Sequence, residues 1–367
     1  MKNAPHGSIR IFSPEISAEG VVAVSTAIAN GEIGKGAATD LAKVKLRKTL
    51  RLDVNPHLLN SATAALHTAL ESIQVEGRQV IVTCQSFIAT ALAVLYARGK
   101  PLFCDVDPRS GNMCPNHLLN LLNNSSPKAV VVVHWGGNTA SINEIENTCS
   151  AFNVPIVYDC SHALSTTFKG ESVLNFGTYS VASCQAIKEI TCGDGGILCQ
   201  RGDVYVPVEK YTWFGIERND RRELQYTGVV GFKYRMNNLA ASILAAETDK
   251  IINRRDSRAY NASRYDKVVP EGFRVKISAD SKPSYWLYSL LLSNREEFQE
   301  FFHSRGIETS HIDLDMRENP VFGKQSDELE GISLFNRQHV AIPVRHNLTN
   351  CEVDHIEDTL AQFFCRG

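Results

Sequence analysis

The sequence of 367 residues has 38 lysines and arginines against 40 aspartates and glutamates, and 43% of its residues are hydrophobic. The length predicts two or three domains, and the composition is that of a globular protein with a large buried core. The formal net charge of −2 argues against nucleic-acid binding, because proteins that bind phosphate backbones usually carry a basic excess.

The apolar runs of the sequence and the spacing of its cysteines indicate the cellular compartment in which we expect the protein. The N-terminal sequence MKNAPHGSIRIF lacks the apolar core of a signal peptide, and the longest apolar run, AVVVVHW (129–135), is too short to cross a bilayer. The ten cysteines form no CxxC pair and show no zinc-ligand spacing. We therefore expect reduced structural thiols, no metal, and a soluble cytoplasmic protein without a membrane partner.

From residue 60 to 200, short apolar runs alternate with helical segments. Strands are expected at 79–83, 101–107, 128–135 and 154–159, and helices at 87–99, 115–124 and 142–152. Such alternation is typical of βαβ units, so we predict an α/β fold with a parallel sheet covered on both faces.

The character of the sequence changes after this region. Segment 202–230 has weak periodicity and is expected to be a loop or lid. One long helix is predicted over 237–269, with Asn237 as its N-cap. The remainder mixes a short strand (284–292) with helices. We therefore predict a large α/β domain at 1–245 and a smaller C-terminal α+β domain at 246–367.

Residues that could take part in catalysis or ligand binding follow the predicted strands, where open α/β sheets bind their ligands. They are His134, Asp159 and Ser183 at strand ends, Ser86 and Phe87 before a helix, the helix start NSATAAL (60–66), and Lys188 in SCQAIKEITCGDGG (183–196). Each alone has an ordinary interpretation as a cap, a core aromatic or a solvated lysine. Together, a phosphate-binding helix start, an aromatic ring, a carboxylate and a lysine are what pyridoxal phosphate requires.

Seven segments, in the same order, resemble motifs of the DegT/DnrJ/EryC1/StrS family of sugar aminotransferases, which have the pyridoxal-phosphate-dependent transferase fold of type I. The segments are NSATAALHTAL, VIVTCQSFIATALAVLYARGKPLFCDVDP, VVVHWGGN, VPIVYDCSHALSTTFKG, SCQAIKEITCGDGG, GFKYRMNNLAASI and VAIPVRHNLTNCEVDHI. The similarity extends over most of the chain.

The resemblance implies roles around the cofactor ring. Lys188 stands at the position of the Schiff-base lysine, which also moves the proton during transamination. Asp159 would pair with the ring nitrogen, Phe87 would stack on the ring, and His162, where glutamine is usual, would approach the ring hydroxyl.

The resemblance also implies a phosphate site made by Ala62, Thr63 and Ser183. Lys233 stands where an asparagine of the family reaches the phosphate across a dimer interface, and a lysine can bind phosphate as a point charge. Ala62 replaces a glycine of the family, and Asp194 replaces a glutamate in the GEGG segment.

The predicted function is transfer of an amino group from L-glutamate to a nucleotide-linked keto sugar by a homodimer with shared active sites. GFKYRM and WFGIER resemble relatives that aminate C-4, and amination at C-3 is the alternative. Trp213, Phe214, Arg218 and Arg221 of the 202–230 loop either close over a nucleotide diphosphate or remain solvated. A non-catalytic regulatory protein is a second hypothesis. A Rossmann oxidoreductase is disfavoured because no GxGxxG follows the first strand.

Overall fold

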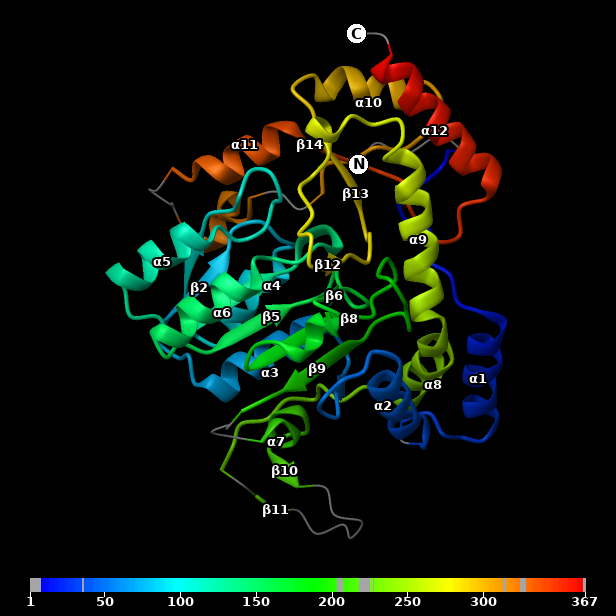
Figure 1. Ribbon diagram of the computed structural model, residues 1–367. Helices are drawn as coiled ribbons and strands as arrows, with labels where there is room; N and C mark the ends of the chain where they lie inside the picture. The colour runs from blue at the N-terminus through cyan, green and yellow to red at the C-terminus, as the bar shows by residue number, and fades with distance from the viewer. Residues whose placement is uncertain are drawn as a thin grey trace.

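A seven-stranded sheet forms the centre of the computed structural model, which describes residues 8–34, 36–202, 207–217, 225–226, 228–312, 315–323 and 328–365 (Figure 1). Its strands run in one direction except for β9, which is antiparallel to both of its neighbours. From edge to edge they are β1 (His57–Leu59), β9 (Gly196–Gln200), β8 (Tyr179–Ser183), β5 (Ile156–Asp159), β4 (Ala129–Val133), β2 (Gln79–Thr83) and β3 (Lys100–Cys104).

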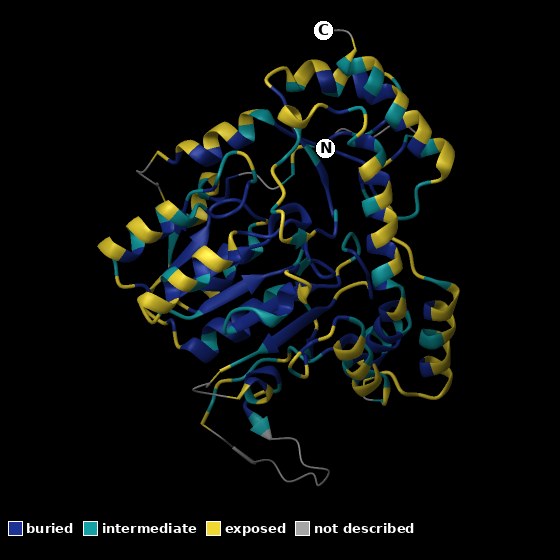
Figure 2. Ribbon diagram, viewed as in Figure 1, coloured by how far each residue is buried: buried dark blue, intermediate teal, exposed yellow. Residues whose placement is uncertain are grey.

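Alternate side chains of the central strands contribute to two hydrophobic cores, one on each face of the sheet. In β4, Val131 and Val133 belong to one core and Val130 and Val132 to the other, which explains the continuous apolar run (Figure 2). The first core includes α3 (Ala62–Ile73) and α4 (Ala89–Tyr96). The second includes α2 (Ala38–Thr49), α5 (Pro115–Asn124), α6 (Ile142–Ala151) and α8 (Asn238–Glu247).

A third core lies in the C-terminal part of the chain, where β13 (Tyr288–Leu291) pairs with β14 (His339–Ile342). Helices α10 (Arg295–His303) and α12 (Asn350–Phe364) pack on it, as does the end of α9 (Ile251–Tyr265). Helix α9 therefore connects this core with the main sheet (Figure 1). The predicted division at residues 245 and 246 falls within α8 and remains a prediction.

The strands and helices expected between residues 79 and 159 are all present, with ends shifted by a few residues. The uninterrupted helix expected over 237–269 is wrong, because a 3-10 turn (Thr248–Lys250) separates α8 from α9. At this turn the Thr248 hydroxyl donates to the Leu244 carbonyl (2.7 Å), a type of bond that bends helices. Asn237 is confirmed as the N-cap, since its side chain accepts a bond from the Ala240 amide (2.9 Å).

Segment 202–230 contains regular structure, so the expectation of a loop is only partly correct. Its described residues include α7 (Val208–Thr212) and the antiparallel pair of β10 (Ile216–Glu217) and β11 (Gln225–Tyr226). Arg218 and Arg221 lie outside the described residues. The other elements are α1 (Ala18–Ala29), α11 (Glu330–Gln338), β6 (Thr167–Phe168), β7 (Glu171–Ser172) and β12 (Ser281–Lys282). Across the described ranges, every helix is too short or too polar to span a bilayer.

Candidate active site

Two neighbouring parallel strands, β5 and β8, bring Asp159 and Ser183 to the same edge of the sheet. Asp159 ends β5 opposite Val181, and Ser183 lies two residues further along β8. Both residues are buried, at 4% and 7% exposure. This edge is where an open α/β sheet binds its ligands.

The Asp159 carboxylate is held by two hydrogen bonds from this edge. The Thr90 hydroxyl of α4 donates to Oδ2 (2.8 Å), and the Ser161 amide donates to Oδ1 (3.0 Å). Phe87 lies just before the helix that contains Thr90, and this residue is 62% exposed, which is unusual for a phenylalanine. The start of α4 therefore lies beside Asp159, through Thr90, and carries the exposed Phe87.

The start of α3 provides an anion-binding site beside Ser183. Ser61 caps this helix by accepting a bond from the Ala64 amide (3.1 Å), and the amides of the first turn have no acceptor within the helix. Gly196 pairs with Ser183 in the β8–β9 ladder and also touches the Ser61 carbonyl. The amides of Ala62 and Thr63 thus lie near Ser183, at the positive end of the helix dipole.

Lys188 and His162 both contact a residue that the sequence did not reveal, Trp286. The Lys188 Nζ lies 4.1 Å from the centre of the Trp286 ring, and the His162 ring stacks on the indole at 3.8 Å. Trp286 lies in the segment expected to be a strand at 284–292, and its aromatic neighbours gave no sign of a role beyond the core. The tertiary structure alone places it beside the lysine.

His162 is a neutral acceptor in this arrangement. Its Nδ1 accepts a bond from the Gly136 amide (3.4 Å), and its ring is buried. Burial, together with the positive charge of Lys188, lowers the pKa of His162 well below its usual value. A neutral imidazole can still hydrogen-bond to a cofactor hydroxyl.

Lys233 lies near the start of α3 through its backbone. Its carbonyl accepts a bond from the Asn60 side chain (3.2 Å), two residues before Ala62, and its side chain is exposed. Its backbone also pairs with Trp213 in an isolated antiparallel bridge. The role implied for it at a neighbouring subunit's phosphate remains a prediction.

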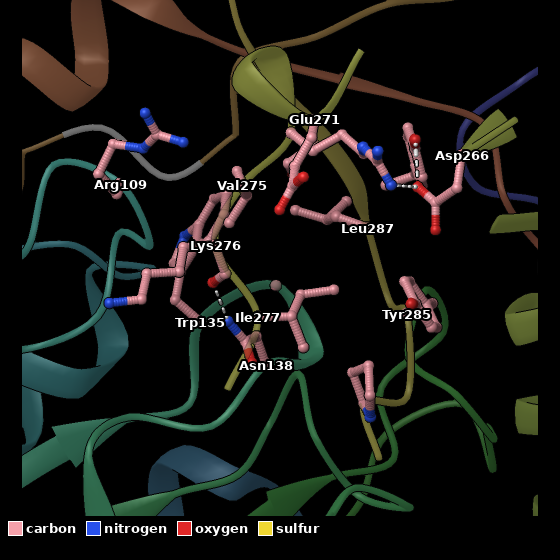
Figure 3. Close-up of a pocket in the computed structure, with 15 residues that line it drawn as sticks. Arg109, Trp135, Asn138, Asp266, Glu271, Val275, Lys276, Ile277, Tyr285 and Leu287 are labelled. Atoms are coloured by element: carbon pink, nitrogen blue, oxygen red, sulfur yellow. Dashed lines mark hydrogen bonds and ion pairs between the residues drawn. The ribbon is translucent and has the colours of Figure 1, made fainter. Parts of the chain in front are cut away.

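A pocket of about 290 Å³ lies apart from these residues, against the segment 283–289 (Figure 3). Tyr285 and Leu287 are part of its wall, and none of the eight predicted site residues lines it. The recess that contains Lys188 is much smaller, about 20 Å³. Pocket size by itself therefore does not indicate the candidate site here.

The fold and the site together define an α/β enzyme with a lysine, a carboxylate and a helix N-terminus at the carboxyl ends of its strands. The model of the DegT/DnrJ/EryC1/StrS aminotransferase family matches residues 14–361. This chain belongs to that family, which confirms the predicted aminotransferase class and the type I fold with its large, mostly parallel sheet.

Similar proteins agree with this assignment. The UDP-4-amino-4,6-dideoxy-N-acetyl-beta-L-altrosamine transaminase of Campylobacter jejuni is 28% identical over 322 residues, covering 83% of this chain and 84% of that protein. The GDP-perosamine synthase of Escherichia coli O157:H7 is 25% identical over 311 residues, with 83% and 85% covered. The crystal structure of the aminotransferase TlmJ from Streptoalloteichus hindustanus superimposes with a TM-score of 0.88 at 25% identity, covering 98% and 100% of the two chains.

Aminotransferases of this family depend on pyridoxal phosphate, and the residues of this site suit that cofactor. First-turn amides and a serine hydroxyl suit a phosphate, a buried carboxylate suits a pyridinium nitrogen, and a lysine suits an aldehyde. The fit therefore rests on the chemistry of the groups that the strand ends bring together.

Proposed function

We propose that this protein is a pyridoxal-phosphate-dependent aminotransferase that moves an amino group from L-glutamate to a nucleotide-linked keto sugar. The observation that carries the proposal is the gathering of Lys188, Asp159 and the start of α3 at one sheet edge in a member of this family. The names of the two relatives, which describe a UDP-sugar transaminase and a GDP-sugar synthase, support the substrate class.

When bound, pyridoxal phosphate supplies an electron sink for the carbon that bears the amino group. Lys188 would hold the cofactor and then take and return the proton at that carbon. Asp159, fixed by Thr90 and Ser161, would keep the ring nitrogen protonated. Phe87 would cover one face of the ring, and neutral His162 would bond to its hydroxyl.

The phosphate would bind Ser183 and the amides of Ala62 and Thr63, and Lys233 would add a charge from a second subunit. We infer a homodimer with shared active sites, supported by exposed apolar side chains on α1 and α2 such as Val22 (64% exposed) and Val44 (66%). The ten unpaired cysteines support action in a reducing compartment, the cytoplasm.

Amination at C-4 is favoured over C-3 by the similarity of GFKYRM and WFGIER to C-4 enzymes. The name of the Campylobacter relative, a 4-amino sugar transaminase, supports the same choice. Incubation with nucleotide-linked 4-keto and 3-keto sugars, followed by NMR of the products, distinguishes the two sites. If only a 3-amino sugar were formed, amination at C-3 would replace the proposed amination at C-4.

The first test is the visible absorbance of the protein with pyridoxal phosphate, before and after L-glutamate. We expect a visible band that L-glutamate bleaches. Lys188→Ala should lack this band and lose at least about 10²-fold in activity, because the proton-transfer group is missing. Lys169→Ala, which removes an exposed lysine from a turn, is the matched control and should keep both.

A wild-type protein without a band would contradict the proposal and favour the non-catalytic regulatory hypothesis. A band that persists in Lys188→Ala would show that another amine holds the cofactor. Sedimentation analysis tests the homodimer, and a monomer with full activity would exclude shared active sites.

A further inference from the structure

Trp286 contacts both the candidate lysine and the loop that carries it. Its ring lies 4.1 Å from the Lys188 Nζ, and its indole N–H donates to the Ile187 carbonyl (3.0 Å). The other contacts of the ring are stacked ones with His162 at 3.8 Å and Phe12 at 5.0 Å. The side chain is only 5% exposed, so its position is determined by packing.

The backbone around Trp286 is held in an unusual conformation. Tyr285 has a positive φ of 48°, which a bulky side chain adopts only where surrounding contacts impose it. The Ser284 amide donates to the Thr166 hydroxyl (3.0 Å), and the Leu287 amide donates to the Gly136 carbonyl (3.1 Å). These bonds dock the segment on the main sheet domain.

Consecutive residues of this docked segment face different sites. Tyr285 and Leu287 line the pocket of about 290 Å³ in Figure 3, whereas Trp286 lines the small recess of Lys188. The segment therefore presents one aromatic ring to the lysine while its neighbours contact a separate cavity.

We propose that Trp286 is a positioning residue, which stabilises the Lys188 ammonium over its ring and fixes the preceding loop residue through its indole N–H. An ammonium group over an indole is attracted by the ring quadrupole, so the contact favours the charged amine. Only the uncharged amine is a nucleophile. Trp286 thus controls the fraction of reactive lysine, a consequence for catalysis that rests on the function proposed above.

Two of the arginines that line the recess of Lys188 are paired with carboxylates. Arg254 lies 2.5 Å from Glu247, and Arg345 lies 3.0 Å from Glu352. His346 lies 3.0 Å from Glu15 but is neutral, because burial and the neighbouring arginines lower its pKa to about 3. The titratable and charged groups that line this recess are Glu15, Glu189, Arg254, Arg258, Arg345 and His346, and the neutral His162 lies beside it. Since paired opposite charges partly cancel at a third site, contact with the uncharged ring is expected to have a measurable effect on Lys188.

The test measures how fast Lys188 is reductively methylated in the cofactor-free protein at a series of pH values, by mass spectrometry of its peptide. Trp286→Leu removes the ring but keeps an apolar cover. We expect the apparent pKa of Lys188 to fall and its methylation at neutral pH to become about three- to tenfold faster. Trp286→Phe keeps a ring and loses the N–H donor, so the rate should stay within about twofold of wild type.

The hydrogen bond from Trp286 to the Ile187 carbonyl is tested separately. The measurement is the rate at which the protein captures added pyridoxal phosphate, followed by visible absorbance. Trp286→Phe should capture it more slowly, because the Ile187 carbonyl has lost its donor. Phe273→Leu is the matched control, since Phe273 packs against Phe364 in the C-terminal part of the chain, and it should change neither rate.

The proposal is overturned if Trp286→Leu methylates at the wild-type rate, or if Phe273→Leu reproduces its effect. Should circular dichroism show that Trp286→Leu is unfolded, Trp286→Met removes the ring with less loss of volume and carries the same expectation. Methylation of the cofactor-free protein does not require turnover, so a failure of the aminotransferase proposal would appear separately, as a missing response to L-glutamate.

Discussion

At Gly196, β9 approaches the start of α3 closely. A Cβ atom there would collide with the carbonyl of Ser61 and the amide of Ala62, and Gly196 is also the ladder partner of Ser183. The missing side chain therefore lets the start of α3 lie beside the end of β8. This approach, rather than any motif of charged residues, gives the proposed phosphate site its shape.

We expect Gly196→Ala to lower the free energy of unfolding by about 1–3 kcal/mol, because backbone atoms must shift to admit the methyl group. The same shift should weaken binding of pyridoxal phosphate. Urea unfolding and a spectroscopic titration measure the two effects. Gly272→Ala is the control, since a Cβ there would have no neighbour within 4 Å. If the two variants had the same free energy of unfolding and bound pyridoxal phosphate equally well, the close approach of β9 to α3 would not be important for either property.

At the scale of the elements, the bend between α8 and α9 is built around the buried carboxylate of Glu247. Its Oε2 lies 2.5 Å from Arg254 of α9, and its Oε1 accepts bonds from the amide (2.9 Å) and hydroxyl (2.5 Å) of Ser17. Glu247 is completely buried. One side chain thus joins both helices to the cap of α1.

Glu247→Gln should destabilise the protein by about 3–5 kcal/mol, since it leaves the Arg254 charge buried without its partner. Asp249→Asn is the matched control, because the ion pair of Asp249 with Lys45 (2.6 Å) is exposed. That change should cost less than about 1 kcal/mol. Urea unfolding measures both, and a small effect at Glu247 would mean that the bend does not depend on the ion pair.

At the scale of the whole molecule, buried histidines connect stability with pH, and His134 and His339 lie outside the candidate site. Burial lowers the pKa of both His134 and His339 from 6.5 to about 3. The unfolded chain therefore takes up these protons at a higher pH than the folded protein. Their contribution to stability is complete above about pH 6.5 and is lost as the pH falls toward 3.

The unfolding free energy should accordingly decrease below about pH 6.5, by up to about 1.4 kcal/mol per pH unit for each histidine. His134→Asn removes one titrating group while keeping an acceptor for the Ala140 amide, so the slope should become shallower. His355→Asn changes an exposed histidine and should leave the slope as it is. An unchanged slope in His134→Asn would contradict this account.

The sequence alone indicated the family and the strands and helices between residues 79 and 159, but not β1 or the antiparallel β9. Central parallel strands are buried on both faces, so their residues form apolar runs such as AVVVV, which the sequence displays directly. Strand ends then locate Asp159 and Ser183, and the order of seven motifs indicates the family. These inferences succeed because each depends on residues close together in the chain.

Contacts between distant segments were decided only by the tertiary structure. Trp286 reaches the loop of Lys188 from about a hundred residues away, the close approach at Gly196 joins α3 to β9, and the Glu247 carboxylate joins α8 to α9 and to the cap of α1. Periodicity shows which face of an element is buried, but it does not show which other element covers that face. The residues that surround Lys188 therefore follow only from the tertiary structure.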